Sequence, residues 1–161
     1  MTSAAILGLA FGIGVVAGLR SLTALAAASW AARLAWINLQ GTHLAFMGSL
    51  PAVWILSILA VAELVNDKLP RTPSRTAPGP LGARILMGGL AAATLTAGAA
   101  GVGGAILPSA LMGAAGAVAG TFGGYQARTR LVRALGVPDI VVALLEDLVA
   151  VGGGLFLASR F

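Results

Sequence analysis

An uncharged stretch of 43 residues, between Arg84 and Arg128, limits what this chain can fold into. A helix that crosses the ~30 Å hydrocarbon core of a bilayer needs about 20 apolar residues, so the stretch has room for two, joined near Pro108 and Ser109. Charged residues make up 9% of the 161 residues and hydrophobic residues 58%, whereas soluble domains carry roughly 25% charged residues. We therefore predict an all-α integral membrane protein.

Three further apolar regions are long enough to span a bilayer, at residues 4–36, 50–65 and 138–159. The first is too long for one simple crossing and has Arg20 near its middle. It is either one long tilted helix or two shorter pieces broken near residues 18–21, and the high free energy of a charge in mid-membrane favours the break. The sequence thus predicts about five transmembrane helices in one domain, residues 1–161, with a proline- and arginine-rich connection at 66–84.

Basic residues lie beside two connections, at 66–84 and 128–138. Five crossings place both connections on one side of the membrane, and the positive-inside rule makes that side cytoplasmic. The net charge of +5 is therefore explained by topology signals at the ends of apolar runs. We expect no nucleic-acid partner.

Two glycine patterns suggest how the helices are related. Residues 14–18 (Gly-Val-Val-Ala-Gly) echo residues 116–120 (Gly-Ala-Val-Ala-Gly), and each segment precedes a span that carries acidic residues. Such a duplication would be inverted, as in many transporters, although a Gly- and Ala-rich composition also produces such matches. Glycines at roughly one-turn spacing in residues 113–124 form a small-residue stripe, through which we expect a homodimer to pack.

Acidic residues inside apolar spans are the sharpest candidates for function. Glu146 and Asp147 lie within the last span, where charged groups are unfavourable unless they are paired, neutral or hydrated. Glu63 and Asp67 lie one turn apart on a single helix face, and Glu63 has about the same depth as Glu146. The acids are either functional or structural partners of arginines, and Asp67 also has the simpler interpretation of an interfacial partner for Lys68.

Basic residues have two interpretations, as topology signals or as binding groups. Arg71, Arg75 and Arg84 frame a proline-stiffened connection, and their guanidinium groups match phosphate or carboxylate in bidentate geometry. Arg20 would be satisfied by an anion or by a carboxylate such as Glu146. We expect Glu63, Glu146 and at least one of these arginines or Arg128 to converge on one polar cavity open to the cytoplasmic side.

The chain has no cysteine and a single histidine, His43, in a polar connection. No Ser-His-Asp set, nucleotide-binding loop or metal motif stands out, so we expect no cofactor and no catalytic residue of the usual hydrolase kinds. Clustered carboxylates would nevertheless suit Mg²⁺, and a metal site stays an open question.

Three polar segments resemble a known family. These are residues 63–76 (Glu-Leu-Val-Asn-Asp-Lys-Leu-Pro-Arg-Thr-Pro-Ser-Arg-Thr), 123–128 (Gly-Gly-Tyr-Gln-Ala-Arg) and 138–147, together with Gly18-Leu19-Arg20-Ser21. They are similar to a bacterial family of small membrane proteins, domain of unknown function 4126. The resemblance implies that these polar motifs are its signature segments, Tyr125 among them, and that the protein resides in a bacterial inner membrane; it implies no activity.

The leading hypothesis is a small transporter or flippase for an anionic or phosphate-bearing substrate, which is a small molecule or a membrane lipid, with proton coupling through Glu63 or Glu146. The alternatives are a membrane enzyme that acts on a lipid head group, and a structural or assembly protein whose acids serve as helix ion pairs. The candidate substrate- or ion-binding residues are Arg20, Glu63, Asp67, Arg71, Arg75, Arg84, Tyr125, Arg128, Glu146 and Asp147.

Overall fold

A computed structural model describes residues 2–68, 74–99 and 105–161 of the chain. These residues form six α-helices and one 3₁₀ helix, and they include no strand. The helices are α1 (Ser3–Leu19), α2 (Ser21–Arg33), η1 (Ala45–Gly48), α3 (Leu50–Asn66), α4 (Pro78–Gly98), α5 (Ile106–Leu135) and α6 (Asp139–Ala158). The prediction of an all-α chain is confirmed.

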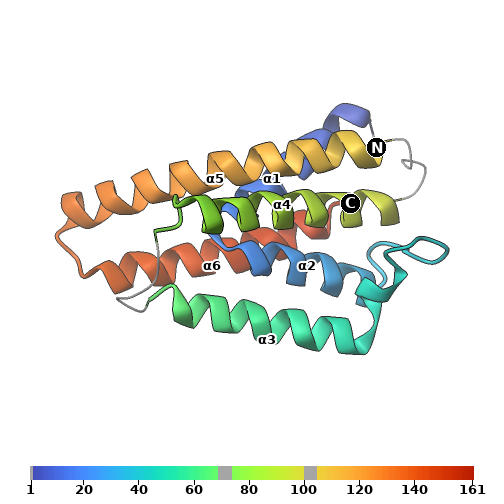
Figure 1. The fold of residues 1–161 in the computed structure, drawn as a ribbon, viewed down its shortest axis with the longest axis horizontal. Coiled ribbons are helices and arrows are strands. Elements are labelled where there is room, and N and C mark those ends of the chain that lie inside the picture. The colour runs from blue at the N-terminus through green and yellow to red at the C-terminus, as the bar shows by residue number, and fades with distance from the viewer. Residues whose placement is uncertain (1, 69–73, 100–104) are drawn as a thin grey trace.

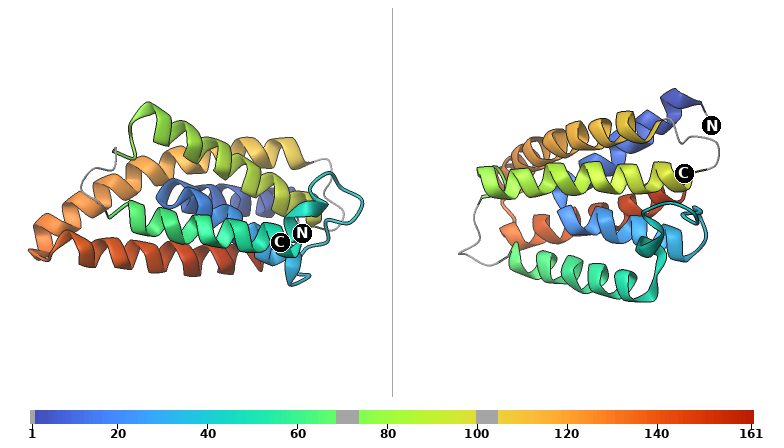
Figure 2. Two further views of the ribbon diagram at one scale, coloured as in Figure 1. Left: turned by 60° about the horizontal axis from the view of Figure 1, so that its bottom comes forward. Right: turned by 45° about the vertical axis from the view of Figure 1, so that its right-hand side comes forward.

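The first apolar region is broken at Arg20, as the cost of its charge predicted. Arg20 has extended backbone angles (φ −145°, ψ 103°) and is the single residue between α1 and α2. Figures 1 and 2 show that α1 runs from the N-terminal end toward the middle of the bundle and that α2 returns to the same end. The two helices therefore form a hairpin with Arg20 at its tip.

Three helices are long and apolar enough to cross a membrane, namely Pro78–Gly98, Ile106–Leu135 and Asp139–Ala158. Together with the composition they indicate a membrane protein. The prediction of five such helices was too high, because the remaining apolar helices α1 and α3 have 17 residues each. At ~1.5 Å per residue such a helix reaches about 25 Å. Each is followed directly by a charged residue, α1 by Arg20 and α3 by Asp67.

The prolines of the described residues lie at helix starts and not at hinges. Helix α4 begins at Pro78, so the second half of the expected 66–84 connection is helical. Pro108 lies in the first turn of α5, and the chain leaves α4 near residue 99, before the expected hinge. Both differences have one cause: proline is tolerated in a first turn, where its missing N–H has no intrahelical acceptor.

Helix α5 is longer than its apolar pattern suggested. It continues through the basic segment that was expected to be a connection and ends at Leu135, where Gly136 takes a left-handed conformation (φ 63°). Polar residues at one end of a helix do not stop it, whereas a left-handed glycine does. The 128–138 connection is therefore mostly helix.

The glycine stripe of α5 packs inside the chain. A Cβ on Gly116 or Gly120 would collide with the backbone carbonyl oxygen of Phe11 or Val15 on α1, and one on Gly113 with that of Gly88 on α4. The prediction of close helix packing is confirmed. Gly113, Gly116 and Gly120 are therefore not available as contacts of the expected homodimer, because α1 and α4 of the same chain already pack against them.

The two echoing segments, 14–18 and 116–120, face each other across this α1–α5 contact. A Cβ on Gly18 would meet backbone atoms of Ala117, Gly120 and Thr121. Both helices start at the end of the bundle that holds the N-terminus and run in the same direction (Figure 1). The expected inverted relation is therefore wrong for these two segments.

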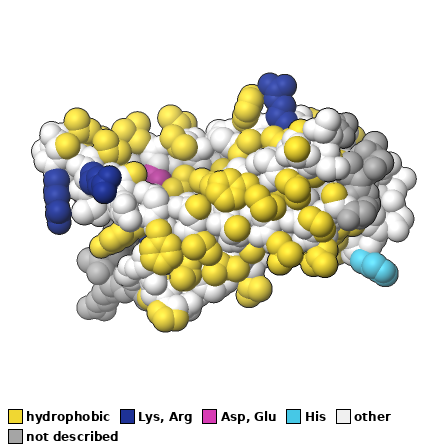
Figure 3. Space-filling model, turned by 90° about the horizontal axis from the view of Figure 1, so that it is seen from above, with side chains coloured by type: hydrophobic (Ala, Val, Ile, Leu, Met, Phe, Trp, Pro, Cys, Tyr) yellow, Lys and Arg dark blue, Asp and Glu magenta, His cyan; other side chains and the backbone are white. Residues whose placement is uncertain are grey.

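Helix α3 lies on the outside of the bundle, where it packs on α2 and η1. Its N-terminus is capped by the Ser49 hydroxyl, which accepts a hydrogen bond from the Ala52 N–H at 3.3 Å. Val53 and Ala60 are its buried residues. Apolar side chains also cover the face of the molecule in Figure 3, as expected of a surface that contacts lipid.

Candidate functional site

One ion-pair network contains all five acidic residues of the chain. Each of them lies within 4.0 Å of at least one basic side chain, and the pairs share members so that all are connected. The acids are Glu63, Asp67, Asp139, Glu146 and Asp147, and the bases are Arg20, Lys68, Arg75, Arg84 and Arg128. Five formal charges of each sign therefore cancel within the network.

Arg20, at the tip of the α1–α2 hairpin, is the centre of the network. Its side chain is 0% exposed. The Nε donates to Asp147 at 2.7 Å and Nη1 to Asp67 at 2.9 Å, while Nη2 lies 3.6 Å from Glu146. One guanidinium thus joins α3 and α6 to the hairpin, and these charge-assisted hydrogen bonds compensate for its removal from water.

The start of α2 is capped by an acid from another helix. The Glu63 carboxylate, on α3, accepts hydrogen bonds from the backbone N–H of Ser21 at 2.9 Å, from the Ser21 hydroxyl at 2.6 Å and from the N–H of Leu22 at 2.8 Å. The first N–H groups of a helix have no intrahelical partner and carry partial positive charge. Glu63 satisfies two of them at the break.

The end of α1 is capped in the opposite sense by Arg84 of α4. Its Nη1 donates to the carbonyl oxygens of Gly18 at 2.9 Å and Leu19 at 2.7 Å. Its Nη2 lies 3.4 Å from Asp67 and 3.9 Å from Glu63. The backbone groups freed by the break are therefore held by a cation on one side and an anion on the other.

Two adjacent acids of α6 share Arg20 but otherwise bind different cations. Glu146 forms a bidentate pair with Arg75, whose second hydrogen bond measures 3.0 Å, and lies 3.5 Å from Arg128. Asp147 binds Lys68 as well as Arg20. Neighbouring helix positions point ~100° apart, which explains why their other partners differ.

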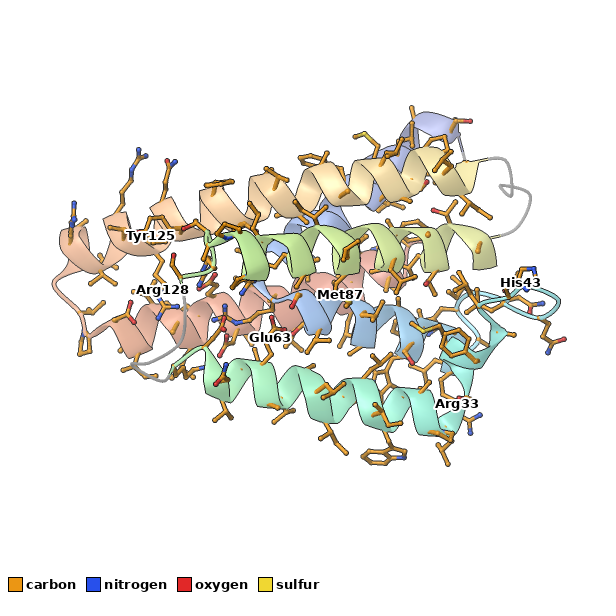
Figure 4. The ribbon with its side chains drawn as sticks, viewed as in Figure 1. Arg33, His43, Glu63, Met87, Tyr125 and Arg128 are labelled. Atoms are coloured by element: carbon orange, nitrogen blue, oxygen red, sulfur yellow. The ribbon has the colours of Figure 1, made fainter. Side chains whose placement is uncertain are left out.

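The outermost pair joins α5 to the start of α6. Arg128 donates from Nε to Asp139 at 2.8 Å, and the Asp139 side chain is 62% exposed. Figure 4 places Arg128 and Glu63 in one half of the bundle and Arg33 and His43 at the opposite end. The network therefore belongs to the end where the 66–84 connection and the α5–α6 turn lie.

A cavity of about 790 Å³ adjoins the network between α3 and α4. Its charged lining consists of Glu63 and Asp67 from α3 with Arg75 and Arg84, and Ser21 contributes a hydroxyl. The rest is mainly apolar. The other lining residues are Leu22, Leu59, Ala62, Val65, Asn66, Pro80 and Ala83.

The structure brings eight of the ten candidate residues into the network. Arg71 lies outside the described residues. Tyr125 is 49% exposed, and its backbone carbonyl accepts a hydrogen bond from Thr129, so it is not part of the network. Glu63 and Glu146 share the network as expected, but the lining of the cavity includes Glu63 and not Glu146.

Three participants were not among the candidate residues. Lys68 follows Asp67 directly, and its pairing with an acid of α6 has no signal in the sequence. Asp139 is the first residue of α6, and it lies 11 residues after Arg128, across the short connection between α5 and α6. Ser21 could have been found as the residue after the expected break.

Among the described residues, no three His, Cys, Asp or Glu side chains group as metal ligands.

Comparison with known proteins places this arrangement in a family. No curated protein and no solved structure matches the chain. The model of the family described as domain of unknown function DUF4126 matches residues 7–159 and so covers every residue of the ion-pair network. The chain belongs to the DUF4126 family.

Proposed function

We propose that the protein is a small membrane transporter or flippase for a phosphate-bearing substrate, which it binds in the cavity between α3 and α4. The observation that carries this proposal is the presence of Arg75 and Arg84 in the cavity wall, together with carboxylates and mainly apolar side chains. Guanidinium groups recognise phosphate in bidentate geometry. A cavity of this size lies within the ~300–1,000 Å³ of sites for small ligands.

Exchange of ion-pair partners provides the transport step. A phosphate that enters the cavity replaces Glu146 on Arg75 and Asp67 on Arg84. Glu146 has two other cations nearby, Arg128 at 3.5 Å and Arg20 at 3.6 Å, so it either moves onto them or takes up a proton. Two arrangements of one set of charges are the kind of two-state element that a transporter needs.

The membrane orientation belongs to the same proposal. The basic residues of the network end, with Arg130 and Arg133 beyond it, face the cytoplasm under the positive-inside rule. Both chain termini, which lie at the opposite end in Figure 1, then face out. The α1–α2 hairpin and α3 lie beside α4–α6 in a bacterial inner membrane, and a homodimer forms through a face other than the packed glycines of α5.

Reconstituted liposomes test the proposal. We expect flux of a phosphate-bearing substrate, either inorganic phosphate, a sugar phosphate or a fluorescent phospholipid. The double variant Arg75→Gln/Glu146→Gln removes one cation and one anion together and should lower this flux at least tenfold. The control, Arg33→Gln, removes an exposed cation at the opposite end of the bundle and should retain most of the flux. Absence of flux for all three substrates, or equal flux in the double variant and the control, contradicts the mechanism.

A structural role is the second candidate, and one observation favours it. Every acid already has a basic partner in the resting structure, and Glu63 and Arg84 also cap the broken helix. Under this alternative the folded protein shows no flux, and the double variant Arg75→Gln/Glu146→Gln affects stability alone. The liposome experiment with a parallel unfolding measurement separates the two candidates.

A further inference from the structure

The cavity between α3 and α4 has a lining that carries both signs of charge. Two carboxylates, Glu63 and Asp67, face it together with two guanidinium groups, Arg75 and Arg84. We infer that its ligand is a zwitterionic phospholipid head group that contains an ammonium and a phosphate. This inference rests on the proposed function, whose substrate class it narrows.

Charge balance selects a zwitterion over a simple anion. The described network carries five charges of each sign, so a bound monoanion leaves one uncompensated negative charge in a largely apolar surrounding, which is strongly unfavourable. A head group that brings one charge of each sign leaves the balance unchanged. A bound anion would keep the charges balanced only if a proton bound with it. Its binding would then weaken as the pH rises.

The positions of the charges match such a head group. Glu63 and Asp67 lie one turn apart on α3 and serve as acceptors for the three N–H groups of an ammonium. Arg84 on α4 and Arg75, which precedes this helix, line the cavity, and their guanidinium N–H groups are bidentate donors for the phosphate. The two charged pairs line a single cavity, so one ligand contacts both.

The apolar lining accommodates the acyl chains. Leu59, Ala62 and Val65 of α3 and Ala83 of α4 are exposed residues that line the cavity. Helices α3 and α4 both pack on α2, but they are not a closely packed pair with each other. An apolar opening between α3 and α4 would let a lipid enter the cavity without leaving the membrane.

Direct binding tests the inference separately from transport. The purified protein in mild detergent is titrated with a short-chain phosphatidylethanolamine, the matching phosphatidylglycerol and soluble glycerophosphoethanolamine, and binding is followed by native mass spectrometry and thermal stability. We expect the zwitterionic lipid to bind at least tenfold more tightly than the anionic one at pH 7.5, and glycerophosphoethanolamine, which carries the same net-neutral phosphodiester head group, to compete for the same site. Equal affinity for the two lipids, or tighter binding of the anionic lipid, overturns the inference.

Two variants test the site itself. Ala62→Trp fills the cavity and should weaken binding of the zwitterionic lipid at least tenfold, whereas Ala119→Trp, at an exposed position of α5, should leave it unchanged. Asp67→Asn removes one negative charge, so the network has a net charge of +1. This change should shift the preference toward the anionic lipid by about tenfold. Equal binding by the two tryptophan variants contradicts the site. Selective binding without flux contradicts the proposed transport alone, and flux without lipid selectivity contradicts this inference alone.

Discussion

The Glu63 carboxylate on α3 accepts a hydrogen bond from the backbone N–H of Ser21 at 2.9 Å and so caps the start of a different helix, α2. This contact ties the outermost helix to the tip of the α1–α2 hairpin. It also explains why an acid lies inside an apolar span: the break at Arg20 exposes helix-terminal N–H groups that neither lipid nor the hairpin itself satisfies.

We expect Glu63→Ala to destabilise the fold by about 3–5 kcal/mol. The substitution leaves two N–H groups of α2 without their acceptor and removes an acidic partner of Arg84, and breaking a buried charged contact has a cost of this order. Unfolding by SDS titration in mixed micelles measures the effect. Asp139→Ala, which removes an exposed carboxylate, is the control and should change stability by about 1 kcal/mol or less. Equal losses in the two variants contradict the cap.

Arg20 should tolerate no replacement, including lysine. Its guanidinium donates to Asp147, to Asp67 and to the Leu19 carbonyl oxygen, a fork that a single ammonium does not reproduce. We expect both Arg20→Gln and Arg20→Lys to lose about 3–5 kcal/mol, measured by the same titration. Arg33→Lys, at the other end of the bundle, should behave like the parent protein. A lysine variant at position 20 with parental stability contradicts the role of the fork.

The break at Arg20 and the presence of Glu63 and Glu146 in one network were predictable from the sequence. Both follow from the unfavourable free energy of an unpaired charge inside the membrane. A charge in mid-membrane requires a break near Arg20, and two acids at matched depth require partners on the same side. The direction of α2 was not predictable, since one residue between helices allows a straight or a reversed path. Which of Glu146 and Asp147 makes the shorter contact with Arg20 depends on the rotation of α6, which tertiary packing sets.

The predicted helix boundaries were wrong for a different reason. Pro78 and Pro80 interrupt an apolar pattern and were assigned to a connection, yet a first turn accepts them. The glycines of residues 113–124 marked a packing surface correctly, but small-residue spacing does not identify the partner helix. The partner proved to be α1 of the same chain, which begins more than 100 residues earlier in the sequence.

Glycine substitutions should separate packing positions from exposed ones on α5. A Cβ at Gly120 would lie 2.9 Å from the Cα of Val15 and closer still to its carbonyl oxygen, whereas a Cβ at Gly123 meets nothing within 4 Å. We expect Gly120→Ala to destabilise the protein by about 1–3 kcal/mol through separation of α1 and α5. Gly123→Ala should be neutral or stabilise it by up to about 1 kcal/mol. Thermal unfolding in detergent measures both, and a stable Gly120→Ala variant contradicts the close approach.

The buried and exposed ion pairs of α6 should differ in coupling energy. Arg75 and Glu146 are each 9% exposed, so water screens their interaction little, whereas Asp139 opposite Arg128 is 62% exposed. A double-mutant cycle on Arg75→Gln and Glu146→Gln should give a coupling of about 1.5–3 kcal/mol, since hydrogen bonds between charged groups have this value. The cycle on Arg128→Gln and Asp139→Asn should give about 0.2–1 kcal/mol.

Raising the salt concentration from about 0.05 to about 0.5 M should reduce the Arg128–Asp139 coupling more than the Arg75–Glu146 coupling, because exposed charges are screened more strongly. Equal couplings with equal salt dependence would show that the Arg75–Glu146 pair is solvated and would remove the two-state element on which transport depends.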